Sequence, residues 1–283
     1  MNKYWKSVCK GLAAGALLLT GTTGGITGGE IASAAVPAKL TLEQAFGKLT
    51  APAKALKSFH LSSTKSFDIL IDGEKYTSAD IVDLDINRLP KFAAIGTVND
   101  LEDDPIGFYA TDNEYYGLLD GYLLLDEDED LTSEDTQDGD EAIDPDAEYW
   151  VELSKGVWDN IYTKSQFDPG YILDLVKNYK KSMKVTETES QAVLTMSVAD
   201  PNAAKSLIKV YNKDLTEDAT IQPKTVTWKL YANKKSWQFE KLVVDMNFNL
   251  VEDGEKILVK TKVEAKYTSQ NKVSTIVKPV EIE

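Results

Sequence analysis

Residues 225–267 contain three runs in which apolar and polar side chains alternate, and these runs constrain the fold more than any other part of the sequence. Alternation with a period of two is typical of a strand that buries one face. An acidic turn sequence at 252–255 separates the second run from the third. Three such strands predict an antiparallel meander whose apolar face has to be covered by other parts of the chain.

Helices to cover that face are expected at three places. Thr41 is a candidate N-cap for a helix with apolar residues at helical spacing, and Pro52 should interrupt this helix. Asp168 and Asp200 are each followed by proline, a pair in which the aspartate caps and the proline fits the first turn. The stretch 155–167 shows no clear period and is left open between helix and loop.

Strands account for most of the remaining chain. The dipeptide Asp72-Gly73 predicts a two-residue hairpin between long strands at 59–71 and 74–86. Shorter strands are expected at 91–98, 106–111, 114–119, 122–125, 148–153, 183–187 and 191–198. No inner boundary is rich in proline, glycine or serine. We therefore predict an α+β fold, in which residues 35–283 form a single domain. Its strongly curved antiparallel sheet, a half-open β-barrel, would carry two or three covering helices.

Residues 1–34 have the composition of a secretory signal peptide. Three lysines precede a short apolar segment at 11–19, and a small-residue sequence ends at Ala34. The apolar segment is shorter than the roughly 20 residues of a membrane-spanning helix. The sole cysteine, Cys9, precedes this segment, where it could not carry a lipid at the cleavage site. We expect a secreted, extracellular protein without disulfides or a membrane anchor, with cell-wall association left open.

The excess of acidic over basic residues is concentrated in one segment of the chain. The formal net charge is −15, and thirteen acidic residues but no basic ones lie between residues 126 and 148. Asp126, Asp128 and Asp130 have the opening spacing of a calcium loop, but Leu131 replaces its turn glycine and Gln137 its final glutamate. We predict a disordered, solvated insertion at 126–147. Because no basic patch stands out elsewhere, we expect no nucleic-acid partner.

Motifs that carry catalysis or hold a cofactor are lacking in the sequence. There is no phosphate-binding glycine loop, no nucleophile elbow and no cysteine pair, and His60 is the single histidine. We predict no catalytic residues, no metal site, no cofactor and no enzymatic activity. A hydrolase remains open as a third reading, because carboxylates are available at Asp68, Asp83, Asp85, Asp174 and Glu240 although no pair is singled out.

Three short segments carry a resemblance to a known family. They read Ala-Leu-Lys-Ser-Phe-His at 55–60, Ile-Asp-Gly-Glu at 71–74 and Tyr-Ala-Thr-Asp-Asn-Glu-Tyr-Tyr at 109–116. With the order of elements, they resemble an uncharacterised family of secreted or lipid-anchored Gram-positive proteins, which is similar to the periplasmic lipoprotein carriers of the LolA-like fold and to mycobacterial lipid-binding lipoproteins. The resemblance implies a half-barrel sheet whose concave face, closed by helices, holds acyl chains.

Two functional hypotheses follow. The first is an extracellular, non-enzymatic protein that binds a hydrophobic ligand, a lipid or an acylated peptide, between the concave sheet and its helices. The residues predicted to line that site are Trp228, Leu242, Val244, Met246, Phe248, Ile257 and Val259. The second is a cell-envelope interaction or sensor protein whose core is filled and whose surface contacts a protein partner. Aromatic residues also gather in the central strands, among them Phe108, Tyr109, Tyr115 and Tyr116, and most of these are expected in the core.

Overall fold

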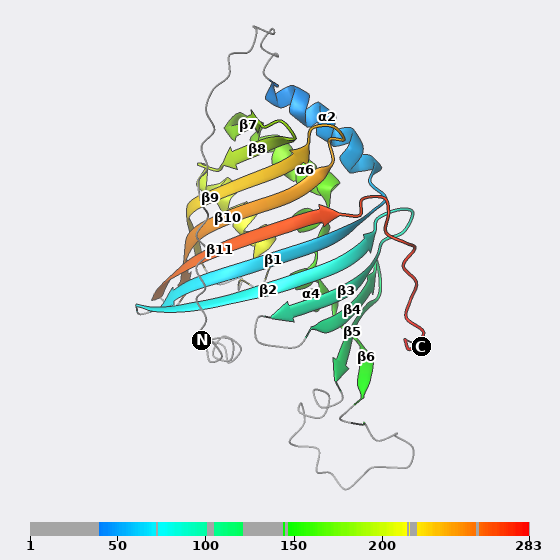
Figure 1. The fold of residues 1–283 in the computed structure, drawn as a ribbon. Coiled ribbons are helices and arrows are strands. Elements are labelled where there is room, and N and C mark those ends of the chain that lie inside the picture. Colours follow the sequence, from blue (N-terminus) through cyan, green and yellow to red (C-terminus); the bar gives the residue numbers. More distant parts are fainter. Residues whose placement is uncertain are drawn as a thin grey trace, which may run out of the picture.

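The computed structural model describes residues 40–71, 73–100, 105–120, 144, 147–213, 215, 220–252 and 255–282. Within these ranges one antiparallel sheet of eleven strands runs in the order β6-β5-β4-β3-β2-β1-β11-β10-β9-β8-β7. Figure 1 shows this sheet curving around helices that lie on its far side in that view. The predicted α+β fold with a curved, open antiparallel sheet is confirmed.

The strands follow the sequence pattern closely. They are β1 (Ser58–Ile71), β2 (Glu74–Asn87), β3 (Ala93–Asp100), β4 (Ile106–Thr111), β5 (Tyr115–Asp120), β6 (Glu148–Glu152), β7 (Met183–Glu187), β8 (Gln191–Ser197), β9 (Thr220–Asn233), β10 (Phe239–Glu252) and β11 (Glu255–Thr268). The alternation of the last three strands places one apolar face inward throughout. The expected strand at 122–125, the signal segment at 1–34 and nearly all of the acidic insertion at 126–147 lie outside the described residues.

The helical cover consists of α2 (Leu42–Ala55), α4 (Lys155–Ile161), α5 (Lys164–Phe167), α6 (Pro169–Val176) and α7 (Pro201–Tyr211), with the 3-10 helix η1 (Lys177–Ser182). The cover holds more helices than expected because the ambiguous stretch 155–167 forms α4 and α5. Thr41 caps α2 through a capping box with Gln44, and Asp168 and Asp200 cap α6 and α7 as predicted. The expected interruption at Pro52 is wrong. The helix continues to Ala55, and buried Ala53 holds its last turn against the core.

Two local meanders meet in the middle of the sheet. Every pair of neighbouring strands is consecutive in the chain except β1 and β11, which pair from His60 with Thr268 to Leu70 with Leu258. The side chains on the concave face form one hydrophobic core together with α2, α4, α6 and α7. No helix in the described ranges is both long and apolar enough to cross a membrane.

Candidate functional site

The seven residues predicted to line a ligand site all point into the core on the concave face. Cross-strand pairing brings them together: Trp228 lies opposite Val244, and Phe248 lies opposite Val259. Their exposed fractions run from 0% for Trp228 to 8% for Ile257, so helices and neighbouring strands cover all seven. Among the described residues, four pockets measure about 250 to 410 Å³; Met246 lines one of them and the other six line none of these four. Their contact with a ligand stays a prediction.

A different group of side chains forms the pocket best suited to an apolar ligand. We call it the aromatic pocket: it measures about 410 Å³ and lies between α4, α5 and the turn from β4 to β5. The aromatic residues that line it are Phe92, Tyr115, Trp158, Tyr162 and Tyr171. Aromatic walls of this kind provide a large apolar contact area with little loss of side-chain freedom.

Helix caps hold the walls of the aromatic pocket in place. Ser154 caps α4 by accepting a hydrogen bond from the backbone N–H of Val157, and Thr163 caps α5 in the same way through Gln166. Trp158 of α4 and Tyr162, the residue that follows this helix as its C-cap, have ring centres 5.8 Å apart. The ring of Tyr115 stacks on Trp158 at 6.2 Å.

Further ring contacts lead from the pocket toward the core. The ring of Tyr162 stacks between Phe92, at 5.6 Å, and Phe167, at 6.0 Å. Trp158, Tyr162 and Phe92 are buried, whereas Tyr115 is half-buried and Tyr171 is exposed. The pocket thus has a closed inner wall and an open outer rim.

Lysines line the rim of the aromatic pocket, and two of them are paired with carboxylates. Lys155 donates to Asp159, at 2.6 Å from Oδ1, and this bond raises the pKa of Lys155 despite a smaller opposing effect of burial. Lys164 donates to Asp112 at 3.1 Å and lies 5.1 Å from the ring centre of Phe92. Since neighbouring carboxylates balance these charges, the rim is weakly charged and contributes aliphatic stems to the pocket.

Buried polar side chains gather on the concave side behind the pocket. Burial raises the pKa of Tyr162 well above its usual value, and the charge of Asp168 raises it further, while Arg88 acts in the opposite direction. The pKa of Tyr267 is also raised, first by burial and then by Tyr211, Tyr162 and Asp168. The hydroxyl of Tyr267 therefore lies within electrostatic reach of those of Tyr162 and Tyr211, and all three are protonated at neutral pH.

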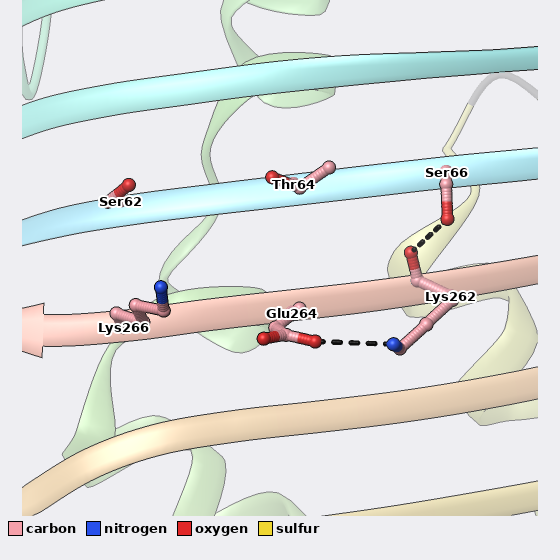
Figure 2. Close-up of a pocket in the computed structure, with 6 residues that line it drawn as sticks. All are labelled: Ser62, Thr64, Ser66, Lys262, Glu264 and Lys266. Carbon is pink, nitrogen blue, oxygen red and sulfur yellow. Dashed lines mark hydrogen bonds and ion pairs between the residues drawn. The ribbon is translucent and has the colours of Figure 1, made fainter. Parts of the chain in front are cut away.

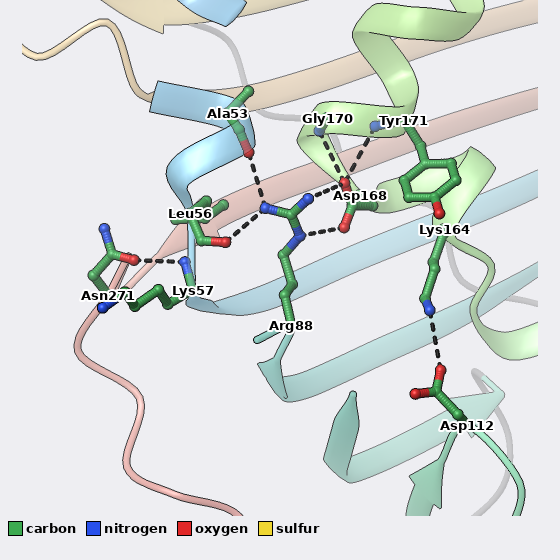
Figure 3. A network of polar contacts seen from close by, with 10 residues as sticks. All are labelled: Ala53, Leu56, Lys57, Arg88, Asp112, Lys164, Asp168, Gly170, Tyr171 and Asn271. Atoms are coloured by element: carbon green, nitrogen blue, oxygen red, sulfur yellow. Dashed lines mark hydrogen bonds and ion pairs between the residues drawn. The ribbon is translucent and has the colours of Figure 1, made fainter. Parts of the chain in front are cut away.

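An ion pair between Arg88 and Asp168 lies next to these hydroxyls (Figure 3). Arg88 Nη2 donates to Asp168 Oδ1 at 2.9 Å, and Nε donates to Oδ2. Arg88 Nη1 donates to the carbonyl oxygens of Ala53 and Leu56 at the end of α2, at 2.9 and 2.6 Å. The other role of Asp168 is to cap α6, where Oδ1 accepts from the N–H groups of Gly170 and Tyr171. These contacts tie α2 and α6 to the end of β2.

The convex face of the sheet carries a groove of another character (Figure 2). It measures about 250 Å³ and is lined by Ser62, Thr64, Ser66, Lys262, Glu264 and Lys266 from β1 and β11. Glu264 accepts from Lys241 and lies 3.3 Å from Lys262; the bond from Lys241 is the largest cause of its lowered pKa. Because hydroxyls and paired charges line it, this groove offers little apolar surface to a hydrophobic ligand.

The carboxylates considered for hydrolysis are dispersed. Asp83 and Asp85 flank His60, whose Nε2 and Nδ1 lie 3.4 and 3.0 Å from their oxygens on the convex face. Asp68 instead contacts Lys75 and Thr77, Glu240 accepts from Gln191 and Asn233, and Asp174 is exposed on α6. Within the described ranges, no three His, Cys, Asp or Glu side chains are grouped so that they could hold a metal ion.

Sequence reasoning named Tyr115 as one of many core aromatics and missed the rest of the aromatic pocket. Phe92 falls within the strand expected at 91–98 but precedes β3, which begins at Ala93, and Tyr171 lies on α6. One signal was available: Ser154 before Trp158 and Tyr162 is a cap followed by aromatic residues at helical spacing. The stretch was left open because α4 and α5 are too short to show a full apolar period.

The fold defines a class of α+β proteins in which helices cover the concave face of one open, curved antiparallel sheet. The chain belongs to the family of unknown function DUF6612, whose model matches residues 41–283. A search of curated proteins gave no match. The expected Gram-positive and lipid-anchored relatives, and the lipoprotein-carrier resemblance, stay predictions.

Two solved structures are similar to this chain at low sequence identity. One is the complex of MucA and MucB from Pseudomonas aeruginosa, with 9% identity and a TM-score of 0.25 over 83% of this chain and 61% of that chain. The other is MucB in complex with MucA(peri), with 9% identity and a TM-score of 0.24 over 85% of this chain and 61% of that chain. The chain thus spans about three fifths of the length of each of these proteins.

Proposed function

We propose that this protein acts outside the cell as a non-enzymatic binding protein for a hydrophobic ligand, a lipid or an acylated peptide. The apolar part of the ligand lies in the aromatic pocket, against Tyr115, Trp158 and Phe92. One observation carries the proposal: stacked rings wall a pocket of about 410 Å³, and two of its rim lysines, Lys155 and Lys164, are paired with carboxylates.

The expected driving force is burial of apolar surface. Each 100 Å² of apolar area removed from water contributes about 2.5 kcal/mol. The rings that receive the ligand are already packed by Tyr162 and Phe167, so little side-chain freedom is lost on binding. The seven concave-face residues lie deeper, in the core of the protein, where a ligand would reach them only if helices moved.

A fluorescence titration tests the proposal. The purified full chain is titrated into N-phenyl-1-naphthylamine, a neutral hydrophobic probe whose emission rises in an apolar site. We expect saturable binding and about a fivefold higher Kd for Tyr115→Ala, because this change removes one aromatic wall. Tyr231→Ala is the matched control, since Tyr231 is also a half-buried strand tyrosine but does not line the pocket. The proposal fails if the unaltered protein shows no saturable enhancement, or if both variants bind alike.

A second function, interaction with a cell-envelope protein partner, is favoured by a different observation. The predicted lining residues are 8% exposed or less and belong to one core, so the concave face is already filled by the chain itself. Under this function, deleting residues 126–146 abolishes capture of the partner and leaves probe binding unchanged. Lipid extraction of the secreted protein followed by mass spectrometry distinguishes the two, because only the first function predicts a copurified hydrophobic molecule.

A further inference from the structure

The lining of the aromatic pocket includes a third lysine, Lys213, which follows the C-cap of α7. The other two lysines of the lining, Lys155 and Lys164, donate to Asp159 and Asp112. Lys213 is exposed, and among the described residues it forms no ion pair, hydrogen bond or ring contact. The pocket therefore has one cation whose charge no neighbouring carboxylate balances.

The backbone that leads into Lys213 is anchored in the core. Asn212, the C-cap of α7, is 3% exposed. Its Nδ2 donates to the backbone oxygen of Ile208 at 2.8 Å, and its Oδ1 accepts from the hydroxyl of Thr261 on β11 at 3.1 Å. Because these bonds fix the start of the lysine, only the side chain of Lys213 has to be ordered when it contacts a ligand.

Gln166 joins the same end of α7 to the pocket wall in α5. Its Nε2 donates to the backbone oxygen of Val210 at 2.7 Å, and its backbone oxygen accepts from the hydroxyl of Tyr211 at 3.4 Å. Gln166 is 3% exposed, and its neighbours Lys164 and Ser165 line the pocket. The helix end that precedes Lys213 is thus bonded directly to an element of the pocket.

The charged residues that line the pocket leave one positive charge in excess. They are three lysines and two aspartates, Asp112 and Asp159. The chain as a whole has a formal net charge of −15, so this local excess has the opposite sign. Opposite charges attract at this range, and an anionic group beside Lys213 therefore gains an interaction that a neutral group of the same shape lacks.

The pocket also separates apolar from polar contacts along its depth. Phe92 and Trp158, on the inner wall, are 6% and 4% exposed, whereas Tyr171 and Lys213 are exposed at the rim. A ligand with its apolar end inward has its polar end beside Lys213 and still in contact with water, so its charge keeps part of its hydration. One free ammonium group matches one negative charge, and a carboxylate carries one at neutral pH.

We propose that Lys213 recognises the anionic end of the ligand, and that the aromatic pocket binds a hydrophobic carboxylate such as a fatty acid. The assignment rests on the proposed function, because the aromatic walls have to hold the apolar part of the same molecule. It narrows that function: among ligands of one shape, the carboxylate is preferred to the neutral amide and to the hydrocarbon.

Three probes of matched shape test this preference. The carboxylate 4-phenylbutanoate, 4-phenylbutanamide and butylbenzene are each used to displace the neutral dye N-phenyl-1-naphthylamine from the full chain at low ionic strength. We expect the carboxylate to bind about fivefold more tightly than the amide, as one solvent-exposed ion pair can provide. Lys213→Gln should remove this difference and leave the affinities for the dye, the amide and butylbenzene unchanged. Lys213→Arg, which keeps the charge, should retain the difference.

Lys209→Gln is the matched control. Lys209 is another exposed lysine without a partner among the described residues; it lies in the last turn of α7 and does not line the pocket. This variant removes the same charge from the protein and should preserve the preference for the carboxylate. Equal weakening by Lys209→Gln and Lys213→Gln would show that net charge sets the preference, and the role of Lys213 would be wrong. Added salt should reduce the preference, because ions screen exposed charges.

The outcomes separate this inference from the proposed function. If the dye and butylbenzene bind but the carboxylate binds no better than the amide, the role of Lys213 is wrong and the aromatic pocket stands. If the preference survives in Lys213→Gln, another group causes it and the assignment is wrong as well. If Tyr115→Ala weakens all three probes while Lys213→Gln weakens only the carboxylate, both proposals are supported. If neither the dye nor butylbenzene binds the unaltered chain, both fall.

Discussion

The guanidinium of Arg88 and the carboxylate of Asp168, 80 residues apart in the chain, form a two-bond ion pair beneath the helical cover. Their side chains are 12% and 3% exposed. The pair joins the end of β2 to the caps of two helices, so it holds the cover on the sheet.

Removal of one partner should destabilise the protein strongly. Arg88→Met leaves the Asp168 carboxylate buried without its cation, a change that costs roughly 3–5 kcal/mol in comparable sites. Lys155→Met, which breaks the exposed pair with Asp159, should cost less than about 0.5 kcal/mol. Urea unfolding followed by circular dichroism measures both. Equal losses for the two variants would show that the Arg88 pair contributes no more than a surface pair.

The close approach of β2 and β3 at Gly96 predicts a second sensitive position. A Cβ atom at Gly96 would lie 2.0 Å from the backbone oxygen of Asp83 and 2.9 Å from Cα of Leu84, so Gly96→Ala has to push two strands apart. We expect a loss of about 3 kcal/mol or more. Gly47→Ala, in α2 with open space around its Cβ, should instead stabilise by about 0.5–1 kcal/mol. The melting temperatures of the two variants should therefore move in opposite directions.

Alkaline pH should unfold the protein through its buried tyrosines. The pKa values of Tyr162, Tyr211 and Tyr267 are raised, chiefly by burial, above the ordinary value of 10.0 that they regain on unfolding. Their contribution to stability is complete below pH 10 and is lost as the pH rises above it. An ultraviolet titration should show three of the 13 tyrosines ionising only together with the unfolding transition. Smooth titration of all 13 before unfolding would contradict this expectation.

Acid should weaken the Lys241–Glu264 contact on the convex face. The pKa of Glu264 is lowered below its ordinary value of 4.5, first by the hydrogen bond from Lys241. A carboxylate whose pKa is lower in the folded than in the unfolded state stabilises the fold at pH values above its unfolded pKa. This stabilisation is lost as the pH falls through the folded pKa. Glu264→Gln should therefore lower the melting temperature at pH 6, and this difference should shrink below pH 4.5. A constant difference across that range would exclude the ionised carboxylate as its source.

The sheet could be predicted from sequence because its signal is local. Trp228 and its alternating neighbours place a whole strand face, and the turn predicted from the sequence Asp72-Gly73 implies the register in which Ile71 of β1 pairs with Glu74 of β2. The sequence signals for the helix starts at Thr41, Asp168 and Asp200 are also local, because the side chain of each cap contacts the first turn of its own helix.

The aromatic pocket and the polar region behind it could not be predicted in this way. Tyr162 and Tyr267 lie 105 residues apart in the chain, and only the tertiary fold brings Tyr162 near enough to raise the pKa of Tyr267. The pairing of Arg88 with Asp168 likewise depends on the tertiary fold, because the two residues are 80 positions apart in the chain. Period and turn chemistry say which face of an element is buried, but they do not say which distant side chain it meets.

The junction of β1 with β11 has a consequence for folding kinetics. Every other strand pair of the described sheet joins strands that are consecutive in the chain, with at most the 27 residues 121–147 between them, while this junction joins residues about 200 positions apart. The entropy lost in closing so long a loop is recovered only after many contacts have formed on both sides. We therefore expect each meander to collapse early and independently, and the joining of β1 to β11 to limit the rate at which the native protein appears.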